Sequence, residues 1–353
     1  MFLFWGISYF IEPLILAVVL ALFVGLAPVL SKTPKGEKQL KLFMALTVIG
    51  YAAVLYAGYA LLVNYAGYVP SLMAFALIFT AFGLVQYLIA PWLINFMYGA
   101  RPAEEVAPWL KESVDRLALK AGFRKPPKAM VADVNIPNAF AYGNFLTGKY
   151  IAVTRGLLES MPREEVEAVI GHELGHHKHK DIWVILALSL APMFIYYLGR
   201  MLMEWGFWSG AMERDRENSS MGLFFAGIIL VAVAMILNFI ILQFNRLREY
   251  YADLHGARVR GKREMQRALA RIHVEMEKLK SNPLLKKELS EFTESPAKML
   301  FIYAFVNTFA DPYYDIDVLV EKLKREDGSS FLEIFMSHPP IPKRLRFLDT
   351  IEE

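Results

Sequence analysis

Two histidines and a glutamate in the stretch His172-Glu173-Leu174-Gly175-His176 carry side chains that can bind a metal and move protons. In a helix, His172 and His176 lie one turn apart and about 40° around the axis, so both imidazoles can reach one cation at about 2 Å. Glu173 falls about 60° from His176. That offset suits a carboxylate that takes a proton from a metal-bound water better than it suits a third ligand. The spacing therefore predicts a hydrolytic zinc site.

The other histidines are few, and the chain contains no cysteine. A tightly bound transition metal must therefore use nitrogen and oxygen ligands. Four of the seven histidines lie between positions 172 and 179. His177 points about 100° or more away from the ligand pair, and His179 lies about 4.5 Å further along the helix. We expect both to be solvated near a membrane surface and not to share the ion.

Long uncharged blocks place this 353-residue chain in the membrane class, with 56% hydrophobic and 21% charged residues. The uncharged block 42–100 would be about 88 Å long as one helix, roughly three times a bilayer core, so it should fold back at 64–71, around Gly67 and Pro70. The pattern predicts five transmembrane helices. They are expected at about 10–30, 43–64, 71–97, 182–203 and 220–244.

Basic residues in the short loops predict the orientation. The segment 31–41 carries four lysines against one glutamate, which favours the cytoplasmic side. We expect a multi-pass protein of the cytoplasmic membrane whose catalytic domain faces the cytoplasm. The expected organisation is a membrane region at 1–97, a first catalytic part at 98–181, a membrane hairpin at 182–245 and a second catalytic part at 246–353.

The third metal ligand should follow the last span. Two spans separate His176 from the segment after Asn245, so both ends return to the same side and depth. Glu249 can complete the coordination sphere and leave a fourth position open for water, as in catalytic zinc sites. Asp253, one turn later, can hydrogen-bond the free nitrogen of a ligating histidine. The alternatives are His255 as third ligand and an ordinary charged face just outside a span.

Short strands precede the metal helix. They are expected at 129–134, 139–142 and 150–154, the last two joined by a loop that contains Gly143 and Gly148. A peptide added as a strand to a sheet edge is held by main-chain hydrogen bonds that ignore its sequence. The candidate edge is Asn138 to Gly143, and the alternative is an ordinary hairpin that covers the metal helix. That helix should begin near Ser160 to Pro162.

Several ordered motifs from about Asn95 to the end resemble the HtpX-type membrane zinc metalloproteases, which are gluzincins with an HExxH motif. The matching residues are Tyr98-Gly99-Ala100-Arg101, Asn138-Ala139-Phe140-Ala141-Tyr142-Gly143, Ala152-Val153-Thr154-Arg155-Gly156-Leu157-Leu158, His172-Glu173-Leu174-Gly175-His176 with Asp181, Arg248-Glu249-Tyr250 with Ala252-Asp253, and Ser337-His338-Pro339-Pro340 with Arg344. The resemblance implies that His172, His176 and Glu249 bind one zinc ion per chain and that Glu173 is the general base.

The resemblance also implies roles for residues around the metal. His338 would stabilise the oxyanion or support the site beside the cleft. Asp253 and Asp181 would contact the metal ligands without binding the metal themselves. Substrate contacts are expected from Arg344 and from the edge strand, comprising Asn138, Ala139, Phe140, Ala141, Tyr142 and Gly143. Similar enzymes degrade damaged or misfolded membrane proteins, so the expected partners are peptide or membrane-protein substrates and the lipid bilayer. The family more often has two spans before the catalytic region, whereas three are counted here.

The predicted fold is mainly α and integral to the membrane. It comprises about five transmembrane helices plus a cytoplasmic α+β zincin-like catalytic domain with a small antiparallel sheet. The predicted function is a zinc-dependent endopeptidase of membrane-protein quality control.

Two other functions compete with this prediction. A CAAX prenyl protease shares the metal motif but usually has more spans. A non-catalytic zinc-binding scaffold or a transporter is the alternative of another class. Transport needs ionisable groups inside the bilayer, whereas the spans offer neutral ones such as Gln86 and Asn238. The net charge of only +3, with basic and acidic residues interleaved, implies no nucleic-acid partner.

Overall fold

The computed structural model describes residues 8–66, 70–179, 181–212, 217–281, 315–326 and 331–351. The chain divides into two compact units. The first, here called the apolar unit, comprises Met1–Lys32, Met44–Val85 and Val184–Phe244. The second, the catalytic unit, comprises Thr33–Phe43, Gln86–Trp183 and Asn245–Glu353. Each unit is described by itself.

Five long helices supply the apolar unit, and all of them except α1 also contribute residues to the catalytic unit. They are α1 (Ser8–Leu30), α2 (Gly36–Ala66), α3 (Pro70–Met97), α8 (Asp181–Met212) and α9 (Glu217–Arg260). Each contains one of the predicted spans. In the described part of the chain, two segments are long and apolar enough to cross a bilayer, Gly36–Gly58 and Met221–Arg260, and two shorter apolar helices are Pro13–Leu22 and Gly83–Met97. The count of five spans remains a prediction.

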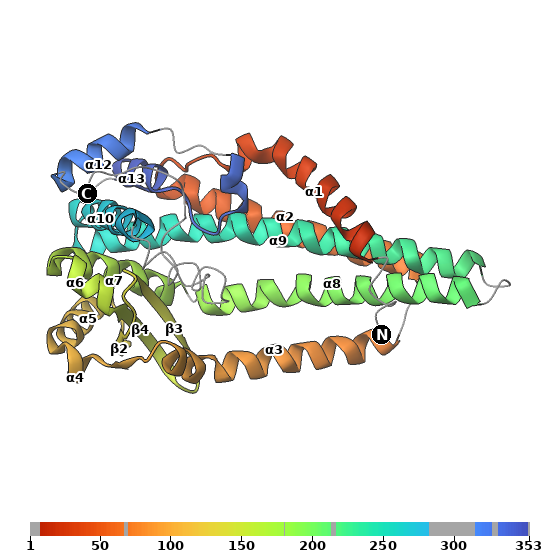
Figure 1. The fold of residues 1–353 in the computed structure, drawn as a ribbon, viewed down its shortest axis with the longest axis horizontal. Coiled ribbons are helices and arrows are strands. Elements are labelled where there is room, and N and C mark those ends of the chain that lie inside the picture. The colour runs from red at the N-terminus through yellow and green to blue at the C-terminus, as the bar shows by residue number, and fades with distance from the viewer. Residues whose placement is uncertain are drawn as a thin grey trace. The chain divides into compact units, whose positions relative to one another are not determined.

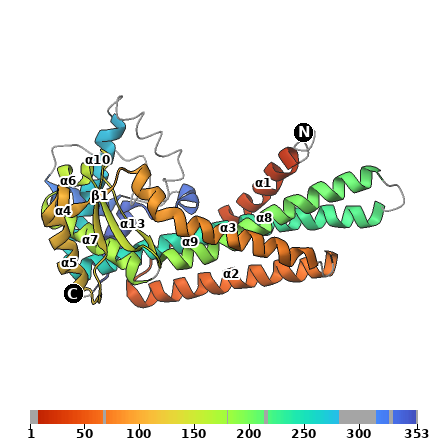
Figure 2. The ribbon, with the colours of Figure 1, turned by 90° about the horizontal axis from the view of Figure 1, so that it is seen from below.

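Helices α8 and α9 lie side by side in the apolar unit (Figures 1 and 2). The residues that pack between them include Leu198, Leu202, Ala226 and Leu230. A β-carbon on Gly227 would lie 2.5 Å from the carbonyl oxygen of Gly199, so only glycine permits this approach. Tyr51 of α2 donates a hydrogen bond to the carbonyl oxygen of Leu188 at 2.6 Å and so ties a third helix to the pair.

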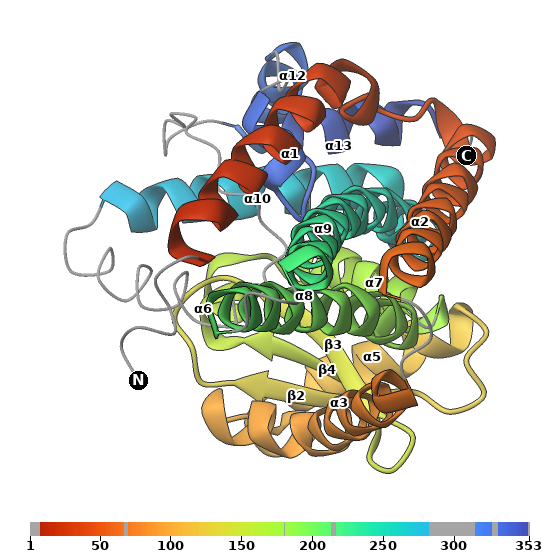
Figure 3. The same ribbon diagram turned by 90° about the vertical axis from the view of Figure 1, so that its right-hand side faces the viewer.

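The catalytic unit contains a four-stranded sheet in the order β1-β2-β4-β3. Its strands are β1 (Arg101–Pro102), β2 (Lys128–Ala132), β3 (Ala139–Asn144) and β4 (Gly148–Thr154). Figure 3 shows β4 between β2 and β3. β2 pairs with β4 in parallel, whereas β3 pairs with β4 antiparallel. The sheet is therefore mixed, and the prediction of an antiparallel sheet is wrong.

This error has a physical cause. Two glycines near the turn between β3 and β4 predict their antiparallel pairing from the sequence. The other neighbour of β4 is β2, which is separated from it in the sequence, and no such feature predicts that pairing. A chain segment between β2 and β4 that includes β3 lets β2 reach the far side of β4 and pair with it in parallel. Residues 150–154 are all buried, and such a continuous apolar run is typical of a central strand.

Helix α7 (Arg163–Lys178) runs through the interior of the catalytic unit, and residues 165–175 are buried without interruption. It packs against β3, β4, α5 (Pro108–Lys120) and α10 (Lys262–Ser281), as Figure 1 shows for the strands. The helix begins directly after Pro162, at the predicted start. Two glutamates in its first turn complement the positive end of the helix dipole.

Arginines from neighbouring helices hold two buried carboxylates of α7. Glu165 accepts two hydrogen bonds from Arg271 of α10. Glu167 accepts from Arg116 of α5 at 2.5 Å and from Arg260 of α9 at 3.0 Å. Hydrogen bonds between ionised groups are stronger than neutral ones, so these contacts fix α7 against three helices.

Short elements complete the described part of the catalytic unit. They are α4 (Ala103–Val106), α6 (Arg155–Ser160), α12 (Ile316–Arg325), the 3-10 helix η4 (Phe331–Phe335) and α13 (Ile341–Asp349). The hydrophobic core of this unit includes residues from the sheet and from α5, α7, α10, α12 and α13. The metal helix therefore has a rigid environment on most of its circumference.

Candidate metal centre and active site

A close contact between α7 and the end of α9 brings polar residues of the two helices together. A β-carbon on Gly175 would lie 3.1 Å from the Cα atom of Ala252, and one on Gly171 would lie 3.1 Å from the Cα atom of Gly256. Both helices therefore carry small residues four positions apart at their contact. Larger side chains would separate the backbones and the polar residues beside them.

Three metal-binding side chains converge beside this contact. The Nε2 atoms of His172 and His176 lie 3.2 Å apart. Glu249 Oε2 lies 3.6 Å from His172 Nε2, and Glu249 Oε1 lies 3.6 Å from His176 Nε2. Ligand atoms about 2.0–2.1 Å from a tetrahedral zinc ion are separated from one another by about 3.3 Å. The three donors therefore have the spacing of a zinc site.

The hydrogen bonding of Glu249 supports the same conclusion. Its side chain is buried, and among the described residues Oε2 lacks a partner with hydrogen-bond geometry. His338 Nδ1 lies 3.1 Å from this oxygen but is not aligned for a hydrogen bond. A buried carboxylate oxygen without an aligned donor is costly, and a cation between the three metal-binding side chains would remove that cost. Two imidazoles and one carboxylate form a common donor set of catalytic zinc.

A buried chain of contacts orients His172. Its Nδ1 lies 2.9 Å from Asp253 Oδ1. Arg344 of α13 donates to both carboxylate oxygens of Asp253, from Nε at 2.8 Å and from Nη2 at 2.6 Å. A carboxylate on Nδ1 holds the proton there and leaves the Nε2 lone pair available for a metal. The side chain of Arg344 is fully buried, which does not favour the substrate contact expected for it.

Glu173 lies beside the donors and is buried. Its carboxylate and the two histidines offer ligand atoms within 4.8 Å of one another. Burial raises the pKa of Glu173 to about 7, although the charge of His176 and a hydrogen bond from the Ala141 N–H oppose the increase. Glu249 makes the better third ligand, because it reaches both Nε2 atoms. Glu173 is then free to act on water.

Strand β3 forms an edge of the described sheet beside Glu173. Thr154 N donates to the carbonyl oxygen of Asn138 at 2.9 Å, so this pair faces inward. In an antiparallel ladder, inward and outward residues alternate. The main-chain groups that face β4 are those of Asn138, Phe140 and Tyr142, and the outward ones are those of Ala139, Ala141 and Gly143. The hydrogen bond from Ala141 to Glu173 agrees with this alternation.

The remaining expected site residues lie around this centre. His338 Nδ1 lies 3.1 Å from Glu249 Oε2. His255 Nδ1 donates to the carbonyl oxygen of Gly171 at 2.9 Å, so it contacts the backbone of α7 and not the Nε2 atoms of the histidine pair. Asp181 begins α8, and its side chain lies outside the described residues.

His177 corrects one expectation. The side chain is 2% exposed, and its Nε2 donates to the carbonyl oxygen of Tyr150 in β4 at 2.7 Å. The prediction that it is solvated is therefore wrong. A position that points away from the metal does not point to water here, because α7 is buried on almost every side. His179 is half-buried, with its ring centroid 4.1 Å from that of Tyr251.

Comparisons with known proteins place this geometry in context. Residues 104–352 match peptidase family M48. The chain is 44% identical over 319 residues to a protease HtpX homolog from Aeropyrum pernix, which covers 87% of this chain and 97% of that relative. A protease HtpX homolog from Archaeoglobus fulgidus is 38% identical over 350 residues, covering 97% of this chain and 98% of the relative.

A solved structure is also similar. Ste24p from S. mikatae has a TM-score of 0.48 and 19% identity, covering 90% of this chain and 68% of that one. This likeness is too distant to support an argument.

Proposed function

The chain belongs to peptidase family M48 and is a membrane metalloprotease, and we propose that it cleaves misfolded or damaged membrane proteins at one zinc centre. The observation that carries the proposal is the convergence of His172, His176 and Glu249, with Glu173 beside these donors and hydrogen-bonded to the outward-facing N–H of Ala141 on β3.

In the proposed site, the two Nε2 atoms and the Glu249 carboxylate hold the metal. Zinc bound there supplies a Lewis acid that polarises the scissile carbonyl group and lowers the pKa of a water molecule. Asp253 and Arg344 keep the Nδ1 proton of His172 in place, so that its Nε2 remains a donor.

Glu173 performs the proton transfers. It takes a proton from the attacking water and passes it to the nitrogen of the leaving amine. The side chain lies next to the donors without being needed as one of them. His338 lies beside Glu249 Oε2, where its imidazole can donate a hydrogen bond to the oxygen of the scissile carbonyl group as negative charge develops.

The outer edge of β3 positions the substrate. Main-chain groups of Ala139 and Gly143 and the carbonyl oxygen of Ala141 face away from the sheet and can pair with an extended peptide, whereas the Ala141 N–H is bonded to Glu173. Such pairing ignores side-chain identity and requires only that the substrate be unfolded locally. Damaged membrane proteins present such segments, whereas folded ones have their main-chain groups already paired. This physical selectivity supports a quality-control role.

We also propose the membrane arrangement that the sequence predicts. In it α1, α2, α3, α8 and α9 cross the bilayer as five spans, and the catalytic residues face the cytoplasm. The lysines of segment 31–41 support that orientation.

Zinc content and cleavage of an unfolded membrane protein test the proposal, with detergent-purified wild type, Glu173→Gln and Glu164→Gln compared. Glu164 is exposed in the first turn of the same helix, so its variant removes an equal charge away from the site. We expect one zinc ion per chain in all three proteins and cleavage by the wild type and Glu164→Gln alone. Chelation should remove the metal and the activity together.

Two results would contradict the proposal. Full cleavage by Glu173→Gln would exclude Glu173 as the base. Cleavage restricted to a prenylated carboxyl-terminal peptide would instead support a CAAX prenyl protease.

A further inference from the structure

Two large apolar side chains are exposed at the turn between β3 and β4. The turn, here called the hairpin tip, consists of Asn144–Thr147. Phe145 and Leu146 are each 61% exposed. Two adjacent apolar side chains exposed at the end of a hairpin give a small apolar surface that could contact something other than water.

Several polar groups of the hairpin tip are paired within the protein. Asn144 Oδ1 accepts hydrogen bonds from Leu146 N and Thr147 N, both at 2.9 Å, and from Thr147 Oγ1 at 3.1 Å. The N–H of Phe145 donates to the hydroxyl oxygen of Tyr87. Asparagine makes such bonds in turns exposed to water as well. In hydrocarbon, every polar main-chain group must find its partner inside the protein.

The hairpin tip is also attached to α3. Asn144 Nδ2 donates to the carbonyl oxygens of Tyr87 at 3.1 Å and Leu88 at 2.8 Å. Pro91 lies inside α3 and has no N–H, so the carbonyl oxygen of Tyr87, four residues earlier, has no helical donor. Asn144 supplies the missing hydrogen bond. A helix in lipid tolerates proline where a neighbouring group makes such a replacement.

Positions along α3 give the depth of this attachment. Trp92 is 54% exposed and Phe96 is 85% exposed, and both lie toward the carboxyl-terminal end of α3, which precedes β1. Tryptophan is enriched where a membrane helix meets the headgroups. Leu88 precedes Trp92 by four residues and Phe96 by eight, which at 1.5 Å per residue is about 6 Å and about 12 Å. The hairpin tip is therefore attached on the hydrocarbon side of these aromatic residues.

We propose that the hairpin tip inserts Phe145 and Leu146 into the hydrocarbon of the bilayer beside α3. The inference rests on the proposed span of α3. Residues 143–148 carry no charge. Lys128, which donates to the carbonyl oxygen of Thr147 at 3.3 Å, has a long side chain that can reach the headgroups from the polar side. The insertion places the outer edge of β3 where a substrate segment leaves the membrane.

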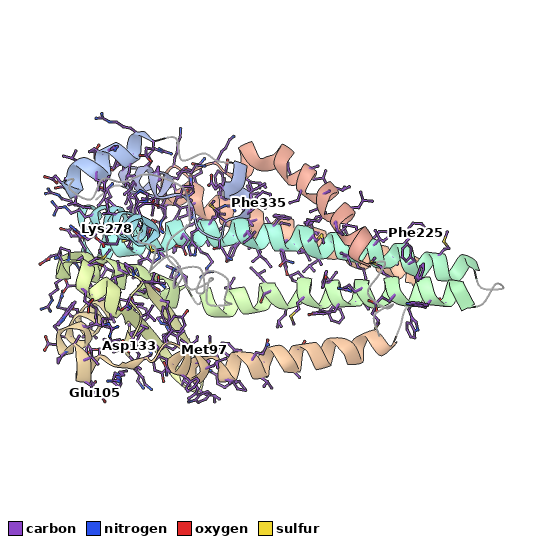
Figure 4. The ribbon with its side chains drawn as sticks, in the orientation of Figure 1. Met97, Glu105, Asp133, Phe225, Lys278 and Phe335 are labelled. Atoms are coloured by element: carbon purple, nitrogen blue, oxygen red, sulfur yellow. The ribbon has the colours of Figure 1, made fainter. Side chains whose placement is uncertain are left out.

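Site-directed spin labelling tests the insertion, and the absence of cysteine means that each single-cysteine variant has one reactive thiol. The variants are Phe145→Cys, Ile89→Cys on the exposed face of α3, and Glu105→Cys on α4, labelled in Figure 4. The full chain is reconstituted in vesicles of phosphatidylcholine and phosphatidylglycerol. Collisions of each label with oxygen, which concentrates in hydrocarbon, are compared with collisions with a water-soluble nickel chelate.

We expect the labels at 145 and 89 to be accessible to oxygen and protected from nickel, and the label at 105 to show the reverse. Protection at 89 with nickel access at 145 would overturn the insertion and leave the proposed span of α3 intact. Nickel access at both positions would overturn the span and the insertion together. Neither readout depends on zinc or on cleavage, so the proposed catalytic roles are tested separately.

A second variant tests the attachment to α3. Asn144→Asp keeps the oxygen that accepts from Leu146 and Thr147 but replaces the amide donor by an oxygen that repels the α3 carbonyl groups. We expect this change to make the label at 145 more accessible to nickel and to leave the label at 89 unchanged. An unaltered depth at 145 would exclude Asn144 as the attachment.

Discussion

Arg344 donates hydrogen bonds to both carboxylate oxygens of Asp253, and Asp253 in turn contacts Nδ1 of His172, the ring nitrogen that is not expected to bind the metal. The residues come from α13, α9 and α7, and both charged side chains are fully buried. Two buried charges are stable only when their hydrogen bonds are well formed. The contact therefore fixes the orientation of His172 through a geometry that few substitutions can reproduce.

Arg344→Lys should weaken zinc binding while keeping the positive charge. Lysine cannot reproduce the two-point contact, so Asp253 and His172 gain freedom. Loss of a group that orients a metal ligand typically costs about 10-fold to 100-fold in affinity. Competition with a chromophoric chelator measures the change. Arg155→Lys, on an exposed arginine paired with an exposed aspartate, is the control. Equal affinities for all three proteins would exclude the orienting role.

Removal of the third ligand should distinguish Glu249 from His255. Glu249→Ala should lose zinc during dialysis, because only two donors remain. His255→Ala should retain it, because that ring bonds to the backbone of α7 and not to the donor atoms. Metal analysis of the two dialysed proteins gives the answer. The opposite result would assign the third ligand to His255.

Proline substitutions on β3 should distinguish the role of its outward N–H groups from that of the N–H groups that pair with β4. Ala141→Pro removes an N–H that faces outward, and an edge strand tolerates that loss. We expect the variant to fold and bind zinc but to lose most cleavage, since the N–H bonded to Glu173 is gone. Tyr142→Pro removes an inward N–H and should destabilise the sheet. Circular dichroism, zinc content and cleavage are compared. Normal cleavage by Ala141→Pro would show that the hydrogen bond from the Ala141 N–H to Glu173 is not needed for activity.

The contact between α7 and α9 should not tolerate a larger residue. A β-carbon on Gly256 would lie 3.1 Å from the Ala168 carbonyl oxygen and 3.1 Å from the His172 amide nitrogen. Overpacking of this kind costs about 1–3 kcal/mol. Gly256→Ala should therefore lower the unfolding temperature in detergent and weaken zinc binding. Gly222→Ala is the control on the same helix, because nothing lies within 4 Å of its added carbon. Equal stability of both variants would exclude the tight contact.

Acid should destabilise the protein partly through Glu167. Burial raises the pKa of this carboxyl group, but a hydrogen bond from Ser113 and the charges of Arg116, Arg163 and Arg260 outweigh burial, so the pKa lies below its usual 4.5. The unfolded chain then binds the proton more readily than the folded one. The stabilisation is complete above pH 4.5 and is lost as the pH falls through the lower folded value.

Glu167→Gln should be less stable than the wild type at pH 7, and the difference should shrink below pH 4.5. Thermal unfolding of chelator-treated protein at each pH measures it without interference from metal loss. Glu164→Gln, at an exposed position, should follow the wild type at every pH. A constant difference between Glu167→Gln and the wild type would contradict the shifted pKa.

The sequence predicts those parts of the fold and the site that have local signals. The start of α7 follows from a proline and two glutamates, and the β3–β4 hairpin follows from Gly143 and Gly148. Gly143 has a φ of 135°, and a β-carbon there would meet the carbonyl oxygen of Gly148 at 2.1 Å. A left-handed turn and a close approach both select glycine, so the signal is strong.

Pairings between distant segments have no such signal. Asp253 and Arg344 are 91 residues apart, and no periodicity connects them. The partner of Arg344 could therefore not be predicted, and the full burial of its side chain does not favour the expected substrate contact. The long-range contact between α7 and α9, in contrast, has a recognisable pattern in the sequence. Small residues four positions apart, at Gly171 and Gly175 and again at Ala252 and Gly256, are typical of helices that touch closely.

The order in which the helices are synthesised bears on the Arg344–Asp253–His172 contact. A ribosome makes α7 first, then α9 and finally α13. His172 is therefore synthesised 172 residues before the guanidinium that completes its support. During that interval the growing protein carries the metal-binding motif without the contacts that orient it. The buried contact that holds His172 can therefore form only after α13 has been synthesised.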